Sequence, residues 1–285
     1  MSWPLTGKVS PPPRAANGEG AAAGRRAGVS VFFPAYNDAE SIGTLVRNAL
    51  AVLPSLADDY EVIVVNDGST DRTAAVLAEL ARTEPRLRVV EHESNRGYGA
   101  ALRTGFASAT KELVFYTDGD GQYDVRELTR LRPLLVDGVD VVNGYKMRRA
   151  DLWRRKALGA AYNRLAHLLF DLPIRDVDCD FRLIRRHAVE RLDLVSSSGS
   201  ICVEMIHKMH RAGCTFVETP VNHYPRAHGR SQFFTLRRVV RTALDLFGLW
   251  VKSGAPSRLT RTAPLLNSRE TPKPKAIHKP EHSGE

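Results

Sequence analysis

The stretch TDGDGQYD, residues 117–124, brings two carboxylates and an amide together. Asp118 and Asp120 follow an apolar run, Gln122 comes two residues later, and glycines stand between them. Oxygen side chains of this kind suit a hard divalent cation that also binds substrate phosphates, and such a cation neutralises a diphosphate leaving group. A polar turn that only ends a strand has the same composition, so the motif alone leaves both interpretations open. An EF-hand is not expected, because no Glu stands at the twelfth position of the loop.

Polar residues also follow three earlier apolar runs: PAYN at 34–37, NDGS at 66–69 and NRGYG at 95–99. In the second, a Gly-Ser turn exposes the Asp67 carboxylate as an acceptor for the N–H of a nucleotide base. The alternative is that Asp67 caps a helix beginning near Thr70. The third nearly matches the dinucleotide fingerprint GxGxxG, but Leu102 replaces the last glycine, so a dehydrogenase is not expected. Its glycines are expected to let the loop approach a ligand before a helix N-terminus.

Short β-rich runs alternate with helical segments between these motifs. Strands are predicted at 29–34, 60–65, 87–92, 112–118 and 139–145, and helices at 41–53, 70–83, 98–109 and 125–136. Continuously apolar strands separated by such helices indicate an α/β fold, with a mostly parallel sheet and helices on both faces in a single domain. Ligands bind such sheets beyond the carboxyl ends of the strands, which is where the polar motifs lie.

The composition of the 285 residues, 43% hydrophobic and 26% charged, is that of an ordinary globular protein. Both ends differ: residues 1–27, rich in Pro, Ala, Gly and Arg, and residues 255–285, rich in Pro, Lys and Ser, are predicted to be disordered. Three cysteines without CxxC spacing argue against a disulfide framework or a zinc site and fit a reducing compartment. No apolar run reaches 18 residues, and the N-terminus lacks the order of a secretory signal.

The formal net charge of +9 points to nucleic acid, an anionic membrane or phosphorylated substrates as partners. No helix-turn-helix, RRM or aromatic-interleaved basic motif is found, so nucleic acid is not the expected partner.

Four segments, VSVFFPAYNDAESI, EVIVVNDGSTDRT, SNRGYGAALRTGF and TDGDGQYD, occur in this order at the predicted strand ends. Together they resemble the family-2 glycosyltransferases, and within these the dolichyl-phosphate mannose synthase-like group, from about Val29 to Gln232. The resemblance implies a GT-A fold over residues 28–232 and a nucleotide-sugar donor, a UDP- or GDP-sugar. It implies that Asp67 hydrogen-bonds the base and that other residues also line the nucleotide site: Pro34, Tyr36, Glu40 and Asp118. It further implies that Asp120 and Gln122 ligate Mg²⁺ or Mn²⁺.

The basic stretch after Tyr145 corresponds to the acceptor half of the lipid-phosphate synthases. Lys146 and Arg155 fall where those enzymes have arginines that bind the acceptor phosphate, although a solvated helix face is the alternative. DVDCDFRL resembles their D-x-x-S-G-F-R-L segment, so that Arg182 is expected at a phosphate and Asp180, in place of Gly, is a candidate base for a hydroxyl acceptor. Several further residues match the acceptor helix and the loop that closes over the diphosphate: Glu204, Arg226 and Ser231, with His228 as an additional candidate metal ligand.

The segment 233–254 has apolar residues on one side and arginines mostly on the other. This pattern suits a basic amphipathic helix resting on an anionic membrane surface, and packing on the sheet is the alternative. We therefore expect a cytoplasmic protein, peripheral at the inner face of the membrane.

The function predicted from these residues is metal-dependent, inverting transfer of a hexose from a nucleotide-diphosphate sugar to a polyprenyl phosphate. A saccharide or small-molecule hydroxyl is the first alternative acceptor. A nucleotide-binding scaffold without catalysis and a basic nucleic-acid-binding protein are the alternatives of another class.

Overall fold

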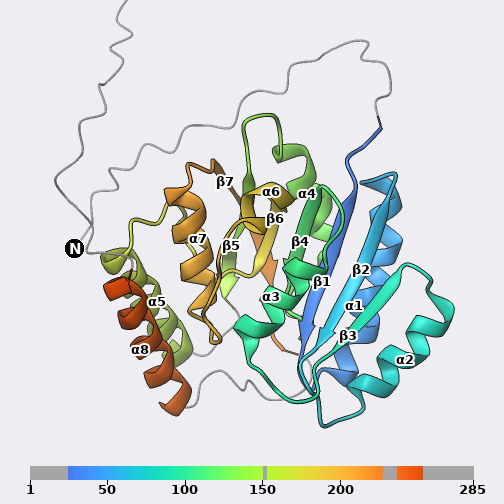
Figure 1. The fold of residues 1–285 in the computed structure, drawn as a ribbon, viewed down its shortest axis with the longest axis horizontal. Coiled ribbons are helices and arrows are strands. Elements are labelled where there is room, and N and C mark those ends of the chain that lie inside the picture. The colour runs from blue at the N-terminus through green and yellow to red at the C-terminus, as the bar shows by residue number, and fades with distance from the viewer. Residues whose placement is uncertain (1–24, 150–152, 227–235, 253–285) are drawn as a thin grey trace, which may run out of the picture.

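The computed structural model describes residues 25–149, 153–226 and 236–252 of the chain (Figure 1). Within these ranges, one seven-stranded sheet has the order β3-β2-β1-β4-β6-β5-β7. The strands are β1 (Val29–Ala35), β2 (Tyr60–Asn66), β3 (Leu87–Glu91), β4 (Leu113–Thr117), β5 (Val141–Arg149), β6 (Phe181–Arg185) and β7 (Phe216–His223). All pairings are parallel except the two made by β6, which runs antiparallel between β4 and β5. The predicted mostly parallel sheet is confirmed.

Helices cover both faces of this sheet, as the sequence predicts (Figure 1). The longer helices are α1 (Ala39–Val52), α2 (Thr73–Thr83), α3 (Tyr98–Ser108), α5 (Trp153–Leu169), α7 (Ile201–Arg211) and α8 (Leu236–Lys252). The short helices are α4 (Leu128–Leu131) and α6 (Arg186–Glu190). The helix predicted over 125–136 is instead broken into α4 and two flanking 3-10 turns, Val125–Glu127 and Arg132–Leu134. Pro133 explains the break, because proline has no N–H to donate inside a helix.

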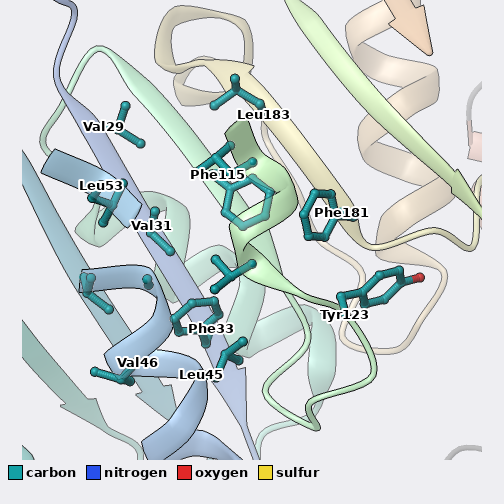
Figure 2. Packing of buried hydrophobic residues seen from close by; sticks show 14 of the residues in the cluster. Val29, Val31, Phe33, Leu45, Val46, Leu53, Phe115, Tyr123, Phe181 and Leu183 are labelled. Atoms are coloured by element: carbon teal, nitrogen blue, oxygen red, sulfur yellow. The ribbon is translucent and has the colours of Figure 1, made fainter. Parts of the chain in front are cut away.

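Two apolar cores form, one on each face of the sheet. The first packs Ile42 and Val46 of α1 and Leu77 of α2 against strand residues such as Phe33 and Phe115. Figure 2 shows Val46, Phe33 and Phe115 in this core. The second packs α3, α7, α5 and α8 against the other side chains of the same strands, for example Phe32 and Tyr116. Alternate residues of β1 and β4 therefore serve opposite cores, which explains why these strands are apolar throughout.

The folded domain begins slightly before the predicted boundary at residue 28. Arg26 donates from Nε to Asp58 Oδ1 at 2.8 Å and from Nη1 to the Ser55 carbonyl at 2.7 Å. Residues 25–27 are thus attached to the loop before β2. The rest of the predicted disordered ends, residues 1–24 and 255–285, lies outside the described residues.

Helix α8 packs on the domain through one face and exposes another. Leu246 and Leu249 are buried in the second core, whereas Leu244, Phe247 and Val251 are exposed. In Figure 1, α8 lies beside α5, which exposes Leu168. The alternative that this segment packs on the domain is confirmed by Leu246 and Leu249. The interpretation as a membrane-surface helix stays a prediction. No helix among the described residues is long and apolar enough to span a bilayer.

Candidate active site

The loops after β1, β2 and β4 meet at one edge of the sheet. Gly119 N donates to the Pro34 carbonyl at 3.2 Å, and Asp67 N donates to the Ala35 carbonyl at 2.9 Å. Ser41 Oγ, at the start of α1, donates to the Gly119 carbonyl at 2.8 Å. Parallel strands bring their carboxyl ends together, so the predicted motifs converge as expected. Pro34 is buried and acts here through its backbone carbonyl, while Tyr36 lies half-buried beside it.

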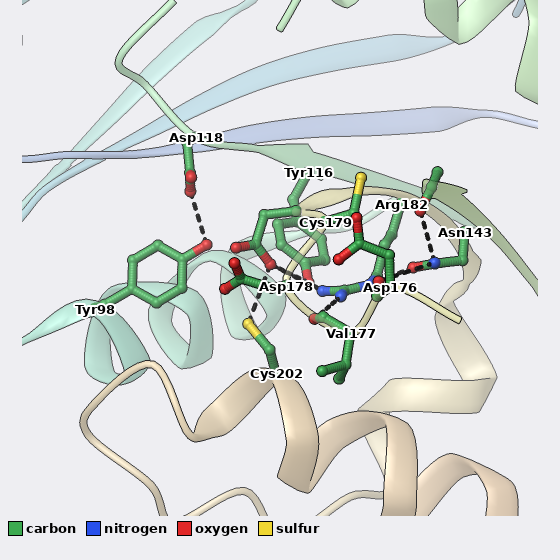
Figure 3. Close-up of polar contacts among 12 residues, drawn as sticks. Tyr98, Tyr116, Asp118, Asn143, Asp176, Val177, Asp178, Cys179, Arg182 and Cys202 are labelled. Atoms are coloured by element: carbon green, nitrogen blue, oxygen red, sulfur yellow. Dashed lines mark hydrogen bonds and ion pairs between the residues drawn. The ribbon is translucent and has the colours of Figure 1, made fainter. Parts of the chain in front are cut away.

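Asp118 sits at the centre of this edge. Tyr98 Oη, from the first residue of α3, donates to Asp118 Oδ1 at 2.7 Å (Figure 3). Burial raises the pKa of Asp118 well above its ordinary value, and the nearby carboxylates of Asp180 and Asp120 raise it further. Negative charge is therefore crowded here, and a cation would relieve it. Tyr98 was not among the predicted site residues, because a tyrosine between two glycines carries no signal of a carboxylate partner.

Asp120 already contacts a cation in this structure. Arg226, which follows β7, forms a short ion pair through Nη2 with Asp120 Oδ2. Gln122 N donates to Asp120 Oδ1 at 3.0 Å, while the Gln122 side chain donates to the Tyr224 carbonyl at 3.0 Å. The segment 224–226 thus lies against the loop after β4, over the position predicted for the metal.

The donor set fits Mg²⁺ or Mn²⁺ that is shared with a substrate. The Asp120 carboxylate forms an ion pair with Arg226, so the position of this carboxylate is suited to a cation. Among the described residues, no three His, Cys, Asp or Glu side chains converge on one point. A site of one or two carboxylates completed by substrate phosphates and water is typical of Mg²⁺. Asp120 is the residue best placed to hold the metal, whereas Gln122 would have to release Tyr224 first.

Asp38 is a carboxylate of this site that the sequence analysis did not single out. Its Oδ2 accepts from Tyr36 N at 2.9 Å, and burial raises the pKa of Asp38 to about 6, with Asp120 as a further contributor. Glu40, which the resemblance proposed, is exposed and lines a hollow of 280 Å³ together with Asp38 and Asp71. Asp38 is therefore the carboxylate after β1 whose pKa is affected by the charge of Asp120. Its signal in the sequence was its place directly after Tyr36-Asn37.

Asp67 is buried and holds the loop that follows β3. Oδ1 accepts from His92 Nδ1 at 2.6 Å and from Arg96 N at 2.9 Å, and Oδ2 accepts from Gly97 N at 2.9 Å. It does not cap α2, which begins at Thr73 and whose first N–H donates to Asp71. The helix-cap alternative is therefore wrong. A carboxylate has about four lone-pair sites, so Asp67 retains capacity for one more donor.

The glycines at the start of α3, Gly97 before it and Gly99 in its first turn, accommodate protein backbone. A Cβ at Gly97 or Gly99 would collide with the carbonyls of Ser197 and Ser196, and Gly99 N donates to the Ser197 carbonyl at 3.0 Å. The expectation that these glycines admit a ligand is thus corrected, because the loop before α7 occupies the space. That loop is fixed by Glu204, which is fully buried and accepts from Val195 N and Ser196 N at 3.0 and 2.8 Å. Glu204 therefore supports a loop and does not face an acceptor.

Arg182 is enclosed in the protein, which corrects its predicted contact with a phosphate. Its side chain has no exposed surface, and it donates to Asn143 Oδ1 at 2.6 Å, to the Val177 carbonyl at 2.5 Å and to Tyr116 Oη (Figure 3). Nη1 also pairs with Asp180 Oδ1 at 2.9 Å. With four of its five N–H groups engaged, Arg182 is a structural cation that joins β4, β5 and β6.

Asp180 is the partner of this buried cation and lies close to Asp118. Its Oδ1 accepts from Arg182 and from the Cys202 thiol at 3.0 Å, and the side chain is 12% exposed. Cys202 was not predicted as a neighbour. The predicted base therefore has one oxygen occupied by internal donors.

Lys146 is the basic residue of the acceptor half that reaches the site. Nζ donates to the Asp178 carbonyl at 2.5 Å and lies 3.5 Å from Asp178 Oδ2. Its charge also lowers the pKa of Asp118, against the larger effect of burial. Arg155 lies in α5, but its side chain is outside the described residues, as are His228 and Ser231.

Solved glycosyltransferases share this architecture. The mannosyltransferase PcManGT from Pyrobaculum calidifontis, solved with GDP-Man and Mn²⁺, aligns with a TM-score of 0.61 and 26% identity over 81% of this chain and 66% of that one. Glucosyl-3-phosphoglycerate synthase from Mycobacterium tuberculosis, solved with Mn²⁺, UDP and phosphoglyceric acid, aligns with a TM-score of 0.58 and 20% identity over 78% of this chain and 79% of that one. The second likeness concerns the fold alone. The architecture is the GT-A fold of glycosyltransferases, as predicted.

The sequence comparisons give the family. Residues 30–193, more than half of the chain, match the model of glycosyl transferase family 2, and the chain belongs to this family. The undecaprenyl-phosphate 4-deoxy-4-formamido-L-arabinose transferase of Enterobacter sp. (strain 638) is 32% identical over 220 residues, or 76% of this chain. The chain spans 66% of that relative, just under two thirds of its length.

Proposed function

We propose that this protein transfers a hexose from a UDP- or GDP-sugar to a polyprenyl phosphate, with inversion and with the help of Mg²⁺ or Mn²⁺. The observation that carries the proposal is the group of carboxylates at the end of β4. The two carboxylates of Asp118 and Asp120 are close enough for the charge of Asp120 to raise the pKa of Asp118. Asp120 already forms an ion pair with the cationic side chain of Arg226. The name of the Enterobacter relative, an undecaprenyl-phosphate transferase, supports this class of acceptor.

Each residue of the site has a task in this proposal. Asp120 would hold the metal, which neutralises the diphosphate as it leaves. Arg226 would then move from Asp120 to the diphosphate oxygens, with which a guanidinium forms paired hydrogen bonds. Tyr98 and Lys146 would favour the ionised form of Asp118 beside the sugar, against the larger effect of burial on its pKa, since a hydroxyl donor and a nearby cation both stabilise the charged carboxylate.

The acceptor phosphate needs no base from the protein. The second pKa of a phosphate monoester is about 6, so the nucleophile is largely ionised at neutral pH. A hydroxyl acceptor would need a base, and Asp180 is the candidate. However, Asp180 Oδ1 is engaged by Arg182 and Cys202, which favours the phosphate over the hydroxyl.

Helix α8 supports a location at the membrane surface. The exposed fractions of its residues Leu244 and Phe247 are 66% and 57%, and Leu168 of α5 is 69% exposed. Apolar side chains on an anchored helix of a protein with net charge +9 suit the interface of an anionic bilayer. We therefore place the protein at the cytoplasmic face of the membrane, peripherally attached.

The reaction is tested with radiolabelled UDP-, GDP- and dTDP-sugars, Mn²⁺ and either undecaprenyl phosphate or water-soluble acceptors. Label in the organic phase that disappears with EDTA supports the proposal. If only soluble acceptors are labelled, the hydroxyl alternative replaces it, and Asp180 becomes the first residue to substitute.

The location is tested by co-sedimentation with phosphatidylglycerol vesicles at low and high salt. The Phe247→Ser and Leu244→Ser variants are expected to bind less, and Val195→Ser, an exposed apolar residue elsewhere, serves as the control. Equal binding of all variants would contradict the assignment to α8.

A further inference from the structure

A second hollow lies at the opposite edge of the sheet from the candidate active site. It has a volume of 410 Å³ and is lined by Arg25, Arg26, Arg132 and Arg185, with Leu113 at the start of β4. Asp137 is the single acidic residue in its lining. Since β4 runs from Leu113 to Thr117, the hollow and the carboxylates after β4 are separated by the length of the strand, about 15 Å.

Two of the arginines lie near carboxylates outside the hollow. Arg26 pairs with Asp58 at 2.7 Å, so its charge is neutralised. Arg25 lies 3.9 Å from Asp59, which also pairs with Lys111 at 2.8 Å and Arg86 at 4.0 Å. One carboxylate shared by three cations leaves a positive excess beside the hollow.

The other two arginines lack a close acidic partner. Arg185 donates to the carbonyls of Val139 and Val136 at 2.9 and 3.1 Å, which fix its position without neutralising it. Its nearest carboxylate, Asp137, is 3.9 Å away and fully exposed, and such pairs are screened by solvent. The Arg132 side chain has neither a hydrogen bond nor an ion pair with any residue that the structure describes, and its Nε is buried.

A buried polar atom without a partner is uncommon in a native protein and calls for a ligand or water. Guanidinium groups pair in a planar fork with phosphate oxygens, and the volume falls in the lower part of the range of small-ligand pockets. We propose that this hollow is a second anion site, which binds a small phosphate-bearing group between Arg132 and Arg185. The group belongs either to a soluble metabolite or to the head of an anionic lipid.

Binding is measured by calorimetry with inorganic pyrophosphate and the full chain, in EDTA at low salt. Arg132→Gln is expected to weaken binding about tenfold, because a charge-assisted hydrogen bond is lost. Arg132→Lys, which keeps the charge, should lie between this variant and the wild type. Arg82→Gln removes an equal charge from an exposed pair on α2 and should change nothing.

One further variant and two further probes separate this site from others. If Arg226→Gln abolishes the heat of pyrophosphate binding and Arg132→Gln does not, the anion binds at the candidate active site and the proposal is wrong. Nucleotide binding with Mn²⁺ should be unchanged in Arg132→Gln, so this proposal can fail while the proposed function stands. Loss of phosphatidylglycerol vesicle binding in Arg132→Gln, with pyrophosphate unaffected, identifies a lipid head group as the ligand. If Arg132→Gln changes the binding of neither pyrophosphate nor phosphatidylglycerol vesicles, the second anion site does not exist.

Discussion

The donor and acceptor sides of the candidate active site differ in how their charges are compensated. On the donor side, burial raises the pKa values of Asp38 and Asp118, and the nearby charge of Asp120 raises both further. Arg226, from a distant segment, is the cation in contact with Asp120. On the acceptor side, Asp180 is paired with the enclosed Arg182, and Glu204 is paired with Lys208 at 2.7 Å.

This contrast indicates which residues are held ready for a ligand and which stabilise the protein. Excess negative charge at the donor side is available to a metal, whereas the acceptor-side charges are used within the fold. Substitutions on the donor side should therefore reduce activity and leave stability largely intact. Substitutions on the acceptor side should reduce stability first.

The largest effect is expected for Asp120→Asn, which should lower kcat/KM at least a hundredfold, because several kcal/mol of charge stabilisation by the metal are lost. Thermal unfolding monitored by circular dichroism should change little. Asp124→Asn is the matched control, since Asp124 lies on the same loop but pairs with Arg126. Full activity of the Asp120→Asn variant would contradict the role of a metal held by Asp120 in the reaction.

Arg182→Leu should lower the free energy of unfolding by about 3–5 kcal/mol, because Asp180 is left buried without its cation. The effect is measured by urea denaturation. The double variant with Asp180→Asn should recover part of the loss, since the uncompensated charge is removed. A stable Arg182 variant that fails only in acceptor binding would restore the original phosphate-binding prediction.

Asp67→Ala should weaken nucleotide binding about tenfold, since hydrogen bonds to a charged group are worth about 1.5–3 kcal/mol and the loop at Arg96 and Gly97 loses its anchor. We expect a higher KM for the donor with a smaller change in kcat, and the Kd is measured by calorimetry. Asp67→Asn keeps an acceptor oxygen and should lose less. An unchanged Kd would make Asp67 a residue of loop structure alone.

The smallest effect concerns pH and Asp38. Its pKa is raised from 3.8 to about 6, so the folded state binds this proton more tightly than the unfolded state. The stabilisation is present below the unfolded pKa and is lost as the pH rises through the folded pKa. In EDTA, Asp38→Asn should therefore gain stability relative to the wild type as the pH rises from about 3.8 to about 6, measured by urea denaturation. A constant difference would show that Asp38 is not desolvated.

Most of the fold could be predicted because its strands and helices are apolar in regular patterns. The strands β1, β2 and β4 are buried on both faces, and their continuous apolar runs mark them clearly. Strand β6 was missed because FRLIR contains two arginines, and a buried arginine contradicts the usual pattern. Two of the partners that satisfy Arg182 there, Tyr116 and Asn143, are distant in the sequence.

The site was predicted where chemistry follows directly from position after a strand. Asp118 and Asp120 follow an apolar strand, which alone left a plain polar turn open, and the order of the four motifs decided between the two interpretations. The roles of Arg182 and Glu204 depend on which partners the tertiary structure supplies, and sequence spacing does not reveal those partners. Glu40 was predicted in place of Asp38, because both are acidic residues two positions apart and only their burial in the folded protein distinguishes them.

The antiparallel strand β6 has a consequence for synthesis of the chain. Strands β1 to β4 are able to pair among themselves once residue 117 has left the ribosome, but the free side of β4 is covered only by Phe181–Arg185. Until then the nascent protein carries an exposed, fully apolar strand edge, which is a template for wrong pairing. When β6 pairs with β4, its Arg182 completes the interior and the edge of β4 is no longer exposed to aggregation. Synthesis that slows or stops between residues 117 and 181 should therefore leave insoluble product.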